Sequence, residues 1–185
     1  MLEQSDGKVC SLPLTEVELP QINVLLKLLN SNDKDFYFDL YRNPKLMQHI
    51  KGPLSLALVK RNFIKCLFHN NKTPPSYVSY VIKNNEKLLG VMSLKPVVNR
   101  VIEVGIIIDT PHQGAGWSSI IKKSLYAYLF NSHQIDSFVS YCDENNLVAN
   151  HINEKLGFEL QAHAFNQRFN RVVKKWVCYA STLEK

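Results

Sequence analysis

A glycine-containing loop between a buried strand and a helix constrains this 185-residue chain more than any other feature. Residues 101–109 (VIEVGIIID) are mostly apolar, which predicts a central strand, and residues 117–130 place apolar side chains at helical spacing. The segment HQGAG, residues 112–116, joins the two. Amide N–H groups at a helix start are unpaired and lie at the positive end of the helix dipole, so we interpret the loop as a candidate pyrophosphate cradle. The alternative is a tight turn that binds nothing.

Two better-defined nucleotide loops are excluded by the residues around the glycines. A P-loop would end in Gly-Lys-Ser/Thr, and Gly116 is followed by Trp117. A dinucleotide-binding fingerprint contains three glycines and lies near the start of the chain. This loop has two glycines and comes late in the chain, so it is not such a fingerprint.

The rest of the chain predicts alternating strands and helices. The predicted strands are residues 22–29, 76–82, 87–95, 101–109, 136–142, 158–165 and 172–180. The predicted helices are residues 34–50 with a break at Asn43–Pro44, a segment capped by Ser55, residues 117–130, and residues 146–156 with Gly157 as the cap. This order predicts a mixed α/β sheet with helices on its faces. Residues 21–185 are expected to form one domain, and residues 1–20 an N-terminal extension with little structure of its own.

Composition narrows the class of protein. A hydrophobic fraction of 45% and a charged fraction of 21% are typical of a soluble globular domain. The four cysteines form no CxxC or zinc-ribbon pattern, so no metal site is predicted. Isolated cysteines and a polar start without a secretory signal favour a cytoplasmic location. No stretch approaches the ~20 apolar residues that cross a bilayer, so no membrane association is expected.

The net charge of +6 suits an anionic partner, such as a phosphorylated cofactor, an acidic protein or RNA, and equally suits simple solubility. Nucleic acid is the weakest of these partners, because the chain lacks a basic stripe interleaved with aromatic residues.

A second segment gives the loop a family context. Residues 142–158 (CDENNLVANHINEKLGF) place an asparagine at a helix start and Gly-Phe at its end. Together with residues 113–118 (QGAGWS), this resembles the GNAT superfamily of N-acetyltransferases, whose phosphate loop reads Gln/Arg-x-x-Gly-x-Gly/Ala, with Ser118 in place of the final small residue. One branch continues with Asn-x-x-Ser and, about seven residues later, Gly-Phe. Those positions are occupied here by Asn146, Ala149 and Gly157-Phe158.

That branch contains the ribosomal-protein serine/alanine N-acetyltransferases and many small-molecule acetyltransferases. It also typically shows segments like residues 41–47 (YRNPKLM) and 52–55 (GPLS), so the resemblance covers about residues 21–181. The resemblance implies an α/β acyl-CoA-binding fold with a central mixed, mostly antiparallel, splayed sheet flanked by helices. It also implies acetyl-CoA as co-substrate without a metal ion. Dimers are common in the branch, so a homodimer is possible here, but the sequence leaves the oligomeric state open.

By the same resemblance, the strand before the loop parts from its neighbour and pairs its backbone with the pantetheine arm. The matching strand end is Ile106, Ile107 and Ile108, which are otherwise simple core residues. The pyrophosphate would lie on the backbone N–H groups of Gln113, Gly114, Ala115, Gly116, Trp117 and Ser118. Lys122 and Lys123, one turn further on, are candidates for the 3′-phosphate, although a solvated helix face is the alternative.

Three residues are candidates for the chemistry. Glu103 is the candidate general base, because the branch often has a glutamate two residues before a glycine on this strand, here Gly105. A glutamate on the solvent side of the sheet is the alternative, and in a regular strand Glu103 and Ile106 point to opposite faces. Asn146 would hydrogen-bond the pantetheine or the amine, or else cap its helix.

The proton donor to the departing thiolate is where this sequence departs from the family pattern. Many members carry a tyrosine four residues before the Gly-Phe glycine, and here that residue is Asn153, which the resemblance places among the cofactor-binding residues. The serine of the branch is replaced by Ala149. Tyr141 is the candidate substitute, and Tyr179, His112 and His151 are weaker candidates.

Three functions stay open. The first is acetylation of a protein N-terminus, which the basic charge disfavours if the substrate is itself basic. The second is acetylation of a small amine, which the departures at Ala149 and Asn153 slightly favour. The third is an acyl-CoA-binding sensor or partner module with weakened catalysis.

Overall fold

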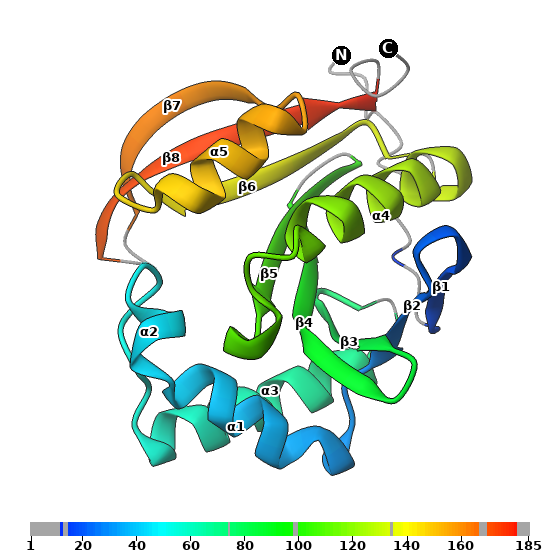
Figure 1. Cartoon of the computed structure of the whole chain (residues 1–185), viewed down its shortest axis with the longest axis vertical. Helices are drawn as coiled ribbons and strands as arrows, with labels where there is room; N and C mark the ends of the chain where they lie inside the picture. Colours follow the sequence, from blue (N-terminus) through cyan, green and yellow to red (C-terminus); the bar gives the residue numbers. More distant parts are fainter. Residues whose placement is uncertain are drawn as a thin grey trace, which may run out of the picture.

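The computed structural model describes residues 12, 15–73, 75–97, 100–133, 135–166 and 170–180 (Figure 1). The strands are β1 (Val17–Leu19), β2 (Val24–Leu28), β3 (Val78–Asn84), β4 (Lys87–Pro96), β5 (Val101–Ile108), β6 (Ser137–Asp143), β7 (Glu159–Asn166) and β8 (Arg171–Tyr179). The helices are α1 (Lys34–Arg42), α2 (Pro44–Met47), α3 (Leu56–Asn70), α4 (Trp117–His133) and α5 (Leu147–Lys155). No helix among these residues is long and apolar enough to span a membrane.

The described strands form one sheet in the order β1-β2-β3-β4-β5-β6-β8-β7. Every neighbouring pair is antiparallel except β5 and β6, which are parallel. A parallel pair needs a crossover connection, and α4 supplies it. The predicted α/β fold with a mixed, mostly antiparallel sheet is therefore confirmed.

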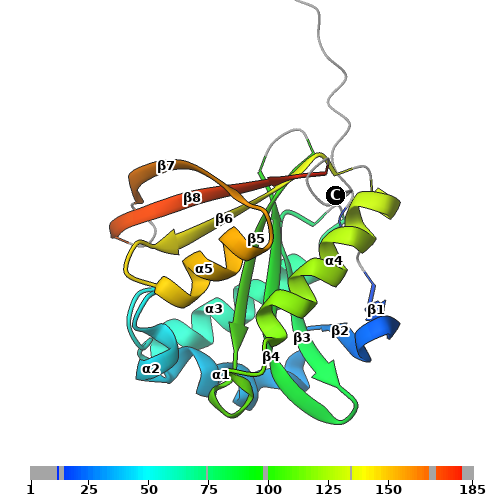
Figure 2. The same cartoon turned by 45° about the horizontal axis from the view of Figure 1, so that its top comes forward.

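The sheet divides between its two parallel strands. β5 and β6 pair over three positions, Val101–Glu103 with Ser137–Val139. Beyond these positions β5 continues on β4 as far as Ile108, whereas β6 continues on β8 as far as Asp143. The opening between residues 104–108 and residues 140–143 is called the fork below, and Figure 2 shows the two strands parting. The predicted splay beside the glycine loop is thus present.

The two faces of the sheet carry separate hydrophobic cores. α4 and α5 cover one face, where Leu125 and Leu129 pack in the same cluster as Ile102 of β5. α1 and α3 cover the other face, where Phe63 packs with Val91 of β4. Figure 2 shows α4 and α5 on the near side of the sheet, with α1 and α3 beyond it. A ligand that enters the fork therefore lies between two layers of helices.

The predicted elements agree with the observed ones within a few residues, with one correction at the start. Residues 17–19 were expected to have little structure, yet they form β1, which pairs with β2 and buries Val17 and Leu19 at 1% exposure each. The strand was not predicted from the sequence because its three residues are too few to show the alternation of apolar and polar side chains. Residues 1–11 and 13–14 of the predicted extension lie outside the described part of the chain.

Candidate active site

The loop after β5 is closed by its own side chains. Asp109 accepts a hydrogen bond from the Thr110 N–H (2.7 Å), which caps a short 3-10 turn over Thr110–His112. The Gln113 side-chain amide donates to the Ile108 carbonyl (3.1 Å) and ties the loop back to the strand end. The Gln113 side chain is therefore used within the loop, which leaves the backbone amides that follow it to face outward.

The backbone amides from Ala115 to Ser118 donate no hydrogen bond to another described residue. Gly114 and Gly116 have φ of +81° and +77°, in the left-handed region that favours glycine. A Cβ atom at Gly114 would meet nothing within 4 Å, so the space beside this glycine is open. Four unpaired donors thus lie at the positive start of α4, as a phosphate site requires.

The edge of β5 offers backbone groups to the fork. The residue that follows β5 donates its N–H to the Leu89 carbonyl (2.8 Å), which fixes the alternation of the β4–β5 ladder. Because antiparallel strands bond through alternate residues, the backbone of Ile107 faces β4, whereas that of Ile106 and Ile108 faces the fork. The Ile108 carbonyl already accepts from Gln113. Ile106 and the residue two before it, Val104, are thus the positions that can pair with an extended ligand.

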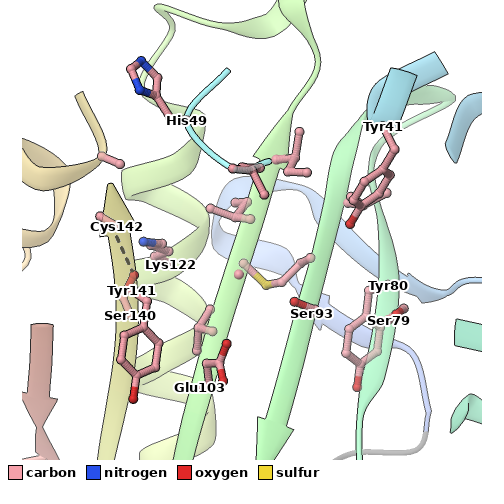
Figure 3. Close-up of a pocket in the computed structure, with 18 of the residues that line it drawn as sticks. Tyr41, His49, Ser79, Tyr80, Ser93, Glu103, Lys122, Ser140, Tyr141 and Cys142 are labelled. Atoms are coloured by element: carbon pink, nitrogen blue, oxygen red, sulfur yellow. Dashed lines mark hydrogen bonds between the residues drawn. The ribbon is translucent and has the colours of Figure 1, made fainter. Parts of the chain in front are cut away.

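The fork opens into a cavity of about 210 Å³ that is lined from both faces of the sheet (Figure 3). Ile106 and Ala149 line it on the side of α4 and α5, and Glu103 and Tyr141 contribute from the other face. In a continuous sheet Glu103 and Ile106 would point apart. They reach one cavity here because the strands separate immediately after Glu103, so the opening connects the two faces.

Glu103 and Tyr141 lie together where the fork closes (Figure 3). The Glu103 side chain is 16% exposed, and its Oε2 lies 3.5 Å from the Lys95 Nζ of the neighbouring strand. Burial, and secondly the negative charge of Glu103, raise the pKa of Tyr141 above its usual value. The phenol therefore stays protonated near neutral pH and can donate a hydrogen bond beside a carboxylate that can accept a proton.

The two asparagines named from the sequence have different surroundings. Asn146 lines the cavity, and its Oδ1 accepts the Ala149 N–H (3.1 Å), so it caps α5. Asn153, predicted to bind the cofactor, is fully buried and is not among the residues that line the cavity. Its Oδ1 accepts from the Lys122 ammonium (3.1 Å), and its Nδ2 donates to the Cys142 sulfur (3.2 Å). Asn153 is thus the centre of a buried polar cluster.

Lys122 differs most from its sequence-based expectation. It was assigned to a solvated helix face or to the 3′-phosphate, but it is 4% exposed and lines the cavity. Its neighbour Lys123 is exposed. The signal was present in the spacing: residue 122 lies three and seven positions before Leu125 and Leu129, on the buried stripe of α4. Burial lowers the pKa of the Lys122 ammonium below its ordinary value.

Comparison with known proteins identifies the family of this chain. A family model described as an acetyltransferase (GNAT) domain matches residues 23–159, which is more than half of the chain. The chain belongs to the GNAT acetyltransferase family. No curated protein sequence matches the chain.

Several solved GNAT structures share its fold. One is a spermidine N-acetyltransferase from Vibrio cholerae in complex with CoA and spermine, with TM-score 0.73 and 21% identity over 88% of this chain and 99% of that one. Another, from Salmonella typhimurium, modifies the N-terminal serine of ribosomal protein L7/L12, with TM-score 0.74 and 16% identity over 89% and 98%. A third is an aminoglycoside acetyltransferase in complex with coenzyme A, with TM-score 0.73 and 17% identity over 87% and 97%.

The remaining candidates of this GNAT domain lie away from the cavity. His151 is exposed on α5 and lies 3.9 Å from the Glu154 carboxylate. Tyr179 is 41% exposed at the end of β8. His112 belongs to the turn before the phosphate loop and does not line the cavity. Of the residues predicted to take part in the chemistry, Glu103, Tyr141 and Asn146 are thus the ones that line the cavity.

The sequence analysis missed a group of polar contacts at the open end of the fork, which is called the polar strut below and consists of Asp143, Arg171 and His49. Asp143, the last residue of β6, forms an ion pair with Arg171 of β8 and lies 3.8 Å from the His49 ring. Arg171 also donates to the Gln48 carbonyl (3.2 Å), which links β8 to the segment after α2. Burial opposes ionisation of Asp143, but the Asn145 N–H and the Arg171 guanidinium hold the pKa of that carboxyl below its usual value. These residues are far apart in the sequence, so no local sequence pattern predicts their contact.

Proposed function

We propose that this GNAT domain transfers an acetyl group from acetyl-CoA to a primary amine by direct attack in a ternary complex. The observation that carries the proposal is that three features follow one another along the fork: unpaired amides at the start of α4, a free β5 edge, and a cavity that contains the partly exposed Glu103 carboxylate. The acceptor is the amine of a small molecule or of a protein N-terminus.

The donor site is built from backbone. The amides of Ala115–Ser118 hold the pyrophosphate, and the fork-facing groups of Ile106 and Val104 pair with the pantetheine arm as an added strand would. A strand advances about 3.3 Å per residue, so an arm lying from Ile108 to Val104 spans roughly 13 Å along the fork. This path brings the thioester to the cavity that contains Glu103.

The acceptor side is built from side chains. Glu103 accepts the proton of the attacking amine, directly or through water, and the Tyr141 hydroxyl donates a hydrogen bond near the reacting carbonyl. The Asn146 side chain caps α5 through its Oδ1, and its amide group lies at the cavity wall where the pantetheine passes. Proximity of donor and acceptor within one cavity supplies a large part of the rate enhancement.

The charge of the acceptor region favours one class of amine. A second cavity of about 550 Å³ adjoins the first through the shared residues Tyr41 and Tyr77. Lys51, Lys65 and Lys95 line it, and no carboxylate occurs among its described lining residues. Lys95 already pairs with Glu103, so Lys51 and Lys65 supply the net positive charge. Such a surface repels a polycation and attracts an anionic group next to the amine. An amine with a neighbouring acidic group therefore fits better than a polyamine, although a spermidine enzyme is among the structural neighbours.

A matched panel of acceptors tests this assignment. Thiol release from acetyl-CoA is measured with a peptide that carries acidic residues after its N-terminus, the same peptide with lysines in their place, a polyamine and an aminoglycoside. The acidic peptide is expected to give the highest kcat/KM, and the double substitution Lys51→Glu, Lys65→Glu is expected to reverse the order of the two peptides. Saturable acetyl-CoA binding without thiol release from any acceptor would favour the alternative, a sensor or partner module.

A further inference from the structure

Lys122 is a buried cation that faces the cavity without an acidic partner. Its ammonium donates to the Asn153 amide oxygen (3.1 Å), and the residue is 4% exposed. Figure 3 shows its side chain between β6 and β5, beside Cys142. Among the described residues, no Asp or Glu carboxylate forms an ion pair with it. An ammonium removed from water normally needs a counter-charge.

The groups packed around Lys122 come from three elements. β6 contributes the Cys142 thiol, which is the titratable group that faces the ammonium, and α5 contributes Asn153. The Phe158 ring centroid lies 6.0 Å from Nζ. On α4 itself, Tyr126 follows one turn later and is fully buried. None of these groups is a carboxylate, the usual partner of a buried lysine, so the Lys122 amino group lies in this cluster without an acidic side chain beside it.

A purely structural role does not account for this arrangement. Residue 122 lies on the stripe of α4 that also buries Ile121 and Leu125, where an apolar side chain would pack without any desolvation cost. What the position lacks is an anion. Acetyl transfer generates one, because the departing group is a thiolate, and Lys122, Ile106 and Ala149 line the same cavity.

We propose that Lys122 stabilises and protonates the sulfur of the departing CoA, in the role for which Asn153 and Ala149 provide no hydroxyl. This inference rests on the proposed acetyl transfer. It makes Lys122 a catalytic residue and makes Asn153 a positioning residue, which holds the ammonium through its amide oxygen. Asn153 is held in turn by its contact with the Cys142 sulfur (3.2 Å).

The step conserves atoms and charge. The acceptor nitrogen attacks the thioester carbonyl carbon and the C–N bond forms. The C–S bond breaks with its electron pair on sulfur, and the Lys122 ammonium transfers one proton to that sulfur to give the CoA thiol and a neutral amine. The proton released by the acceptor nitrogen passes to Glu103 or to water, and Lys122 regains a proton from solvent as products leave. Burial lowers the pKa of Lys122, so its ammonium gives up a proton more readily than that of a solvated lysine, which favours the transfer.

The test is the acidity of CoA bound to the full-length protein, which needs no acceptor. The thiolate of bound CoA is titrated by its ultraviolet absorbance, and the identical titration with desulfo-CoA, which lacks the sulfur, is subtracted to remove protein tyrosines and thiols. A cation beside the sulfur is expected to lower the bound thiol pKa by about one unit or more relative to free CoA. Lys122→Met is expected to abolish this shift, and Lys155→Met, at an exposed lysine of α5, to leave it unchanged.

Kinetics give a second readout. Lys122→Met is expected to lower kcat by roughly 10²–10³-fold, with CoA affinity nearly unchanged, because the lost interaction forms only as the thiolate departs. Its melting temperature is expected to rise, because the substitution removes a buried charge; the increase confirms that the variant folds.

Each outcome decides between two ideas. A wild-type bound thiol that is no more acidic than free CoA overturns the role of Lys122, and does so even if the Met variant fails to fold. A shift that persists in Lys122→Met overturns it as well. Failure of the wild-type protein to bind CoA instead contradicts the proposed acetyl transfer itself.

Discussion

The two ends of the fork are built from different chemical groups. At the α4 end the proposed contacts are backbone amides and a strand edge, and the side chains either turn away or close the loop, as Gln113 does. Where the fork closes, the proposed contacts are side chains, chiefly Glu103 and Tyr141. Backbone groups can hold a ligand without any particular side chain, except where a conformation requires glycine.

This difference predicts opposite sensitivities. Substitutions at the donor end should matter only where they strain the backbone or add charge, and should then act on CoA affinity. Substitutions where the fork closes should act on turnover and leave CoA affinity intact. The adjacent Lys122 and Lys123 show the contrast within one helix turn: the first reaches the cavity and the second is exposed.

Gly116→Asp should give the largest effect, a loss of CoA affinity on the order of 10³-fold, because two like charges about 4 Å apart repel by roughly 4 kcal/mol near a protein surface. Calorimetric titration with CoA measures it. Gly116→Asn is the matched control: it has nearly the same shape, tolerates the φ of +77°, and carries no charge. Equal losses for the two variants would mean that no phosphate lies on this turn.

Glu103→Gln tests the side-chain end, and kcat is expected to fall by about 10²-fold with CoA affinity unchanged. The pH profile of turnover between pH 6 and pH 9 should change as well, because the amide cannot accept a proton. Glu86→Gln, at an exposed hairpin turn, provides the control. Turnover that matches the wild type at every pH would remove Glu103 from the role of base and weaken the contrast between the two ends.

Asp143→Asn should give the smallest effect, a loss of about 1–2 kcal/mol in unfolding free energy at neutral pH, because it breaks the strut to Arg171. The folded-state pKa of Asp143 is lowered, so its contribution is present above the unfolded value of 3.8 and is lost as pH falls through the folded pKa. Thermal unfolding across pH measures this. Asp136→Asn breaks an exposed pair with Arg100 and should change stability little. A pH-independent difference between wild type and Asp143→Asn would contradict the ion-pair explanation.

The sequence was a good guide wherever one local pattern fixed the outcome. The run of apolar residues 101–109 predicted β5, the spacing after Trp117 predicted α4, and the glycines predicted the turn between them. The resemblance to the GNAT superfamily indicated the family. The sequence analysis missed β1, whose three residues are too few to show a period, and it made no prediction of the strand order, in which β8 lies between β6 and β7.

The residues that meet in the cavity were harder to predict, because their proximity depends on separate elements. Glu103 and Tyr141 are 38 positions apart in the sequence and lie on two different strands. These strands pair only where the fork closes, because their pairing ends at Glu103 and Val139. Lys122 was predicted to lie in solvent or at the 3′-phosphate because of its charge. Its position on the apolar stripe of α4 indicated burial instead. Asp143 and Arg171 meet only through the pairing of β6 with β8.

The sequence by itself determined the kind of fold and the place of the glycine loop before α4, because periodicity, glycine conformation and helix-start chemistry act between neighbours in the chain. Only the tertiary structure decided that a carboxylate, a phenol and a buried lysine share one cavity. That outcome depends on where β5 and β6 stop pairing, and the separation of two strands is a property of the packed sheet and its two helical layers rather than of either strand alone.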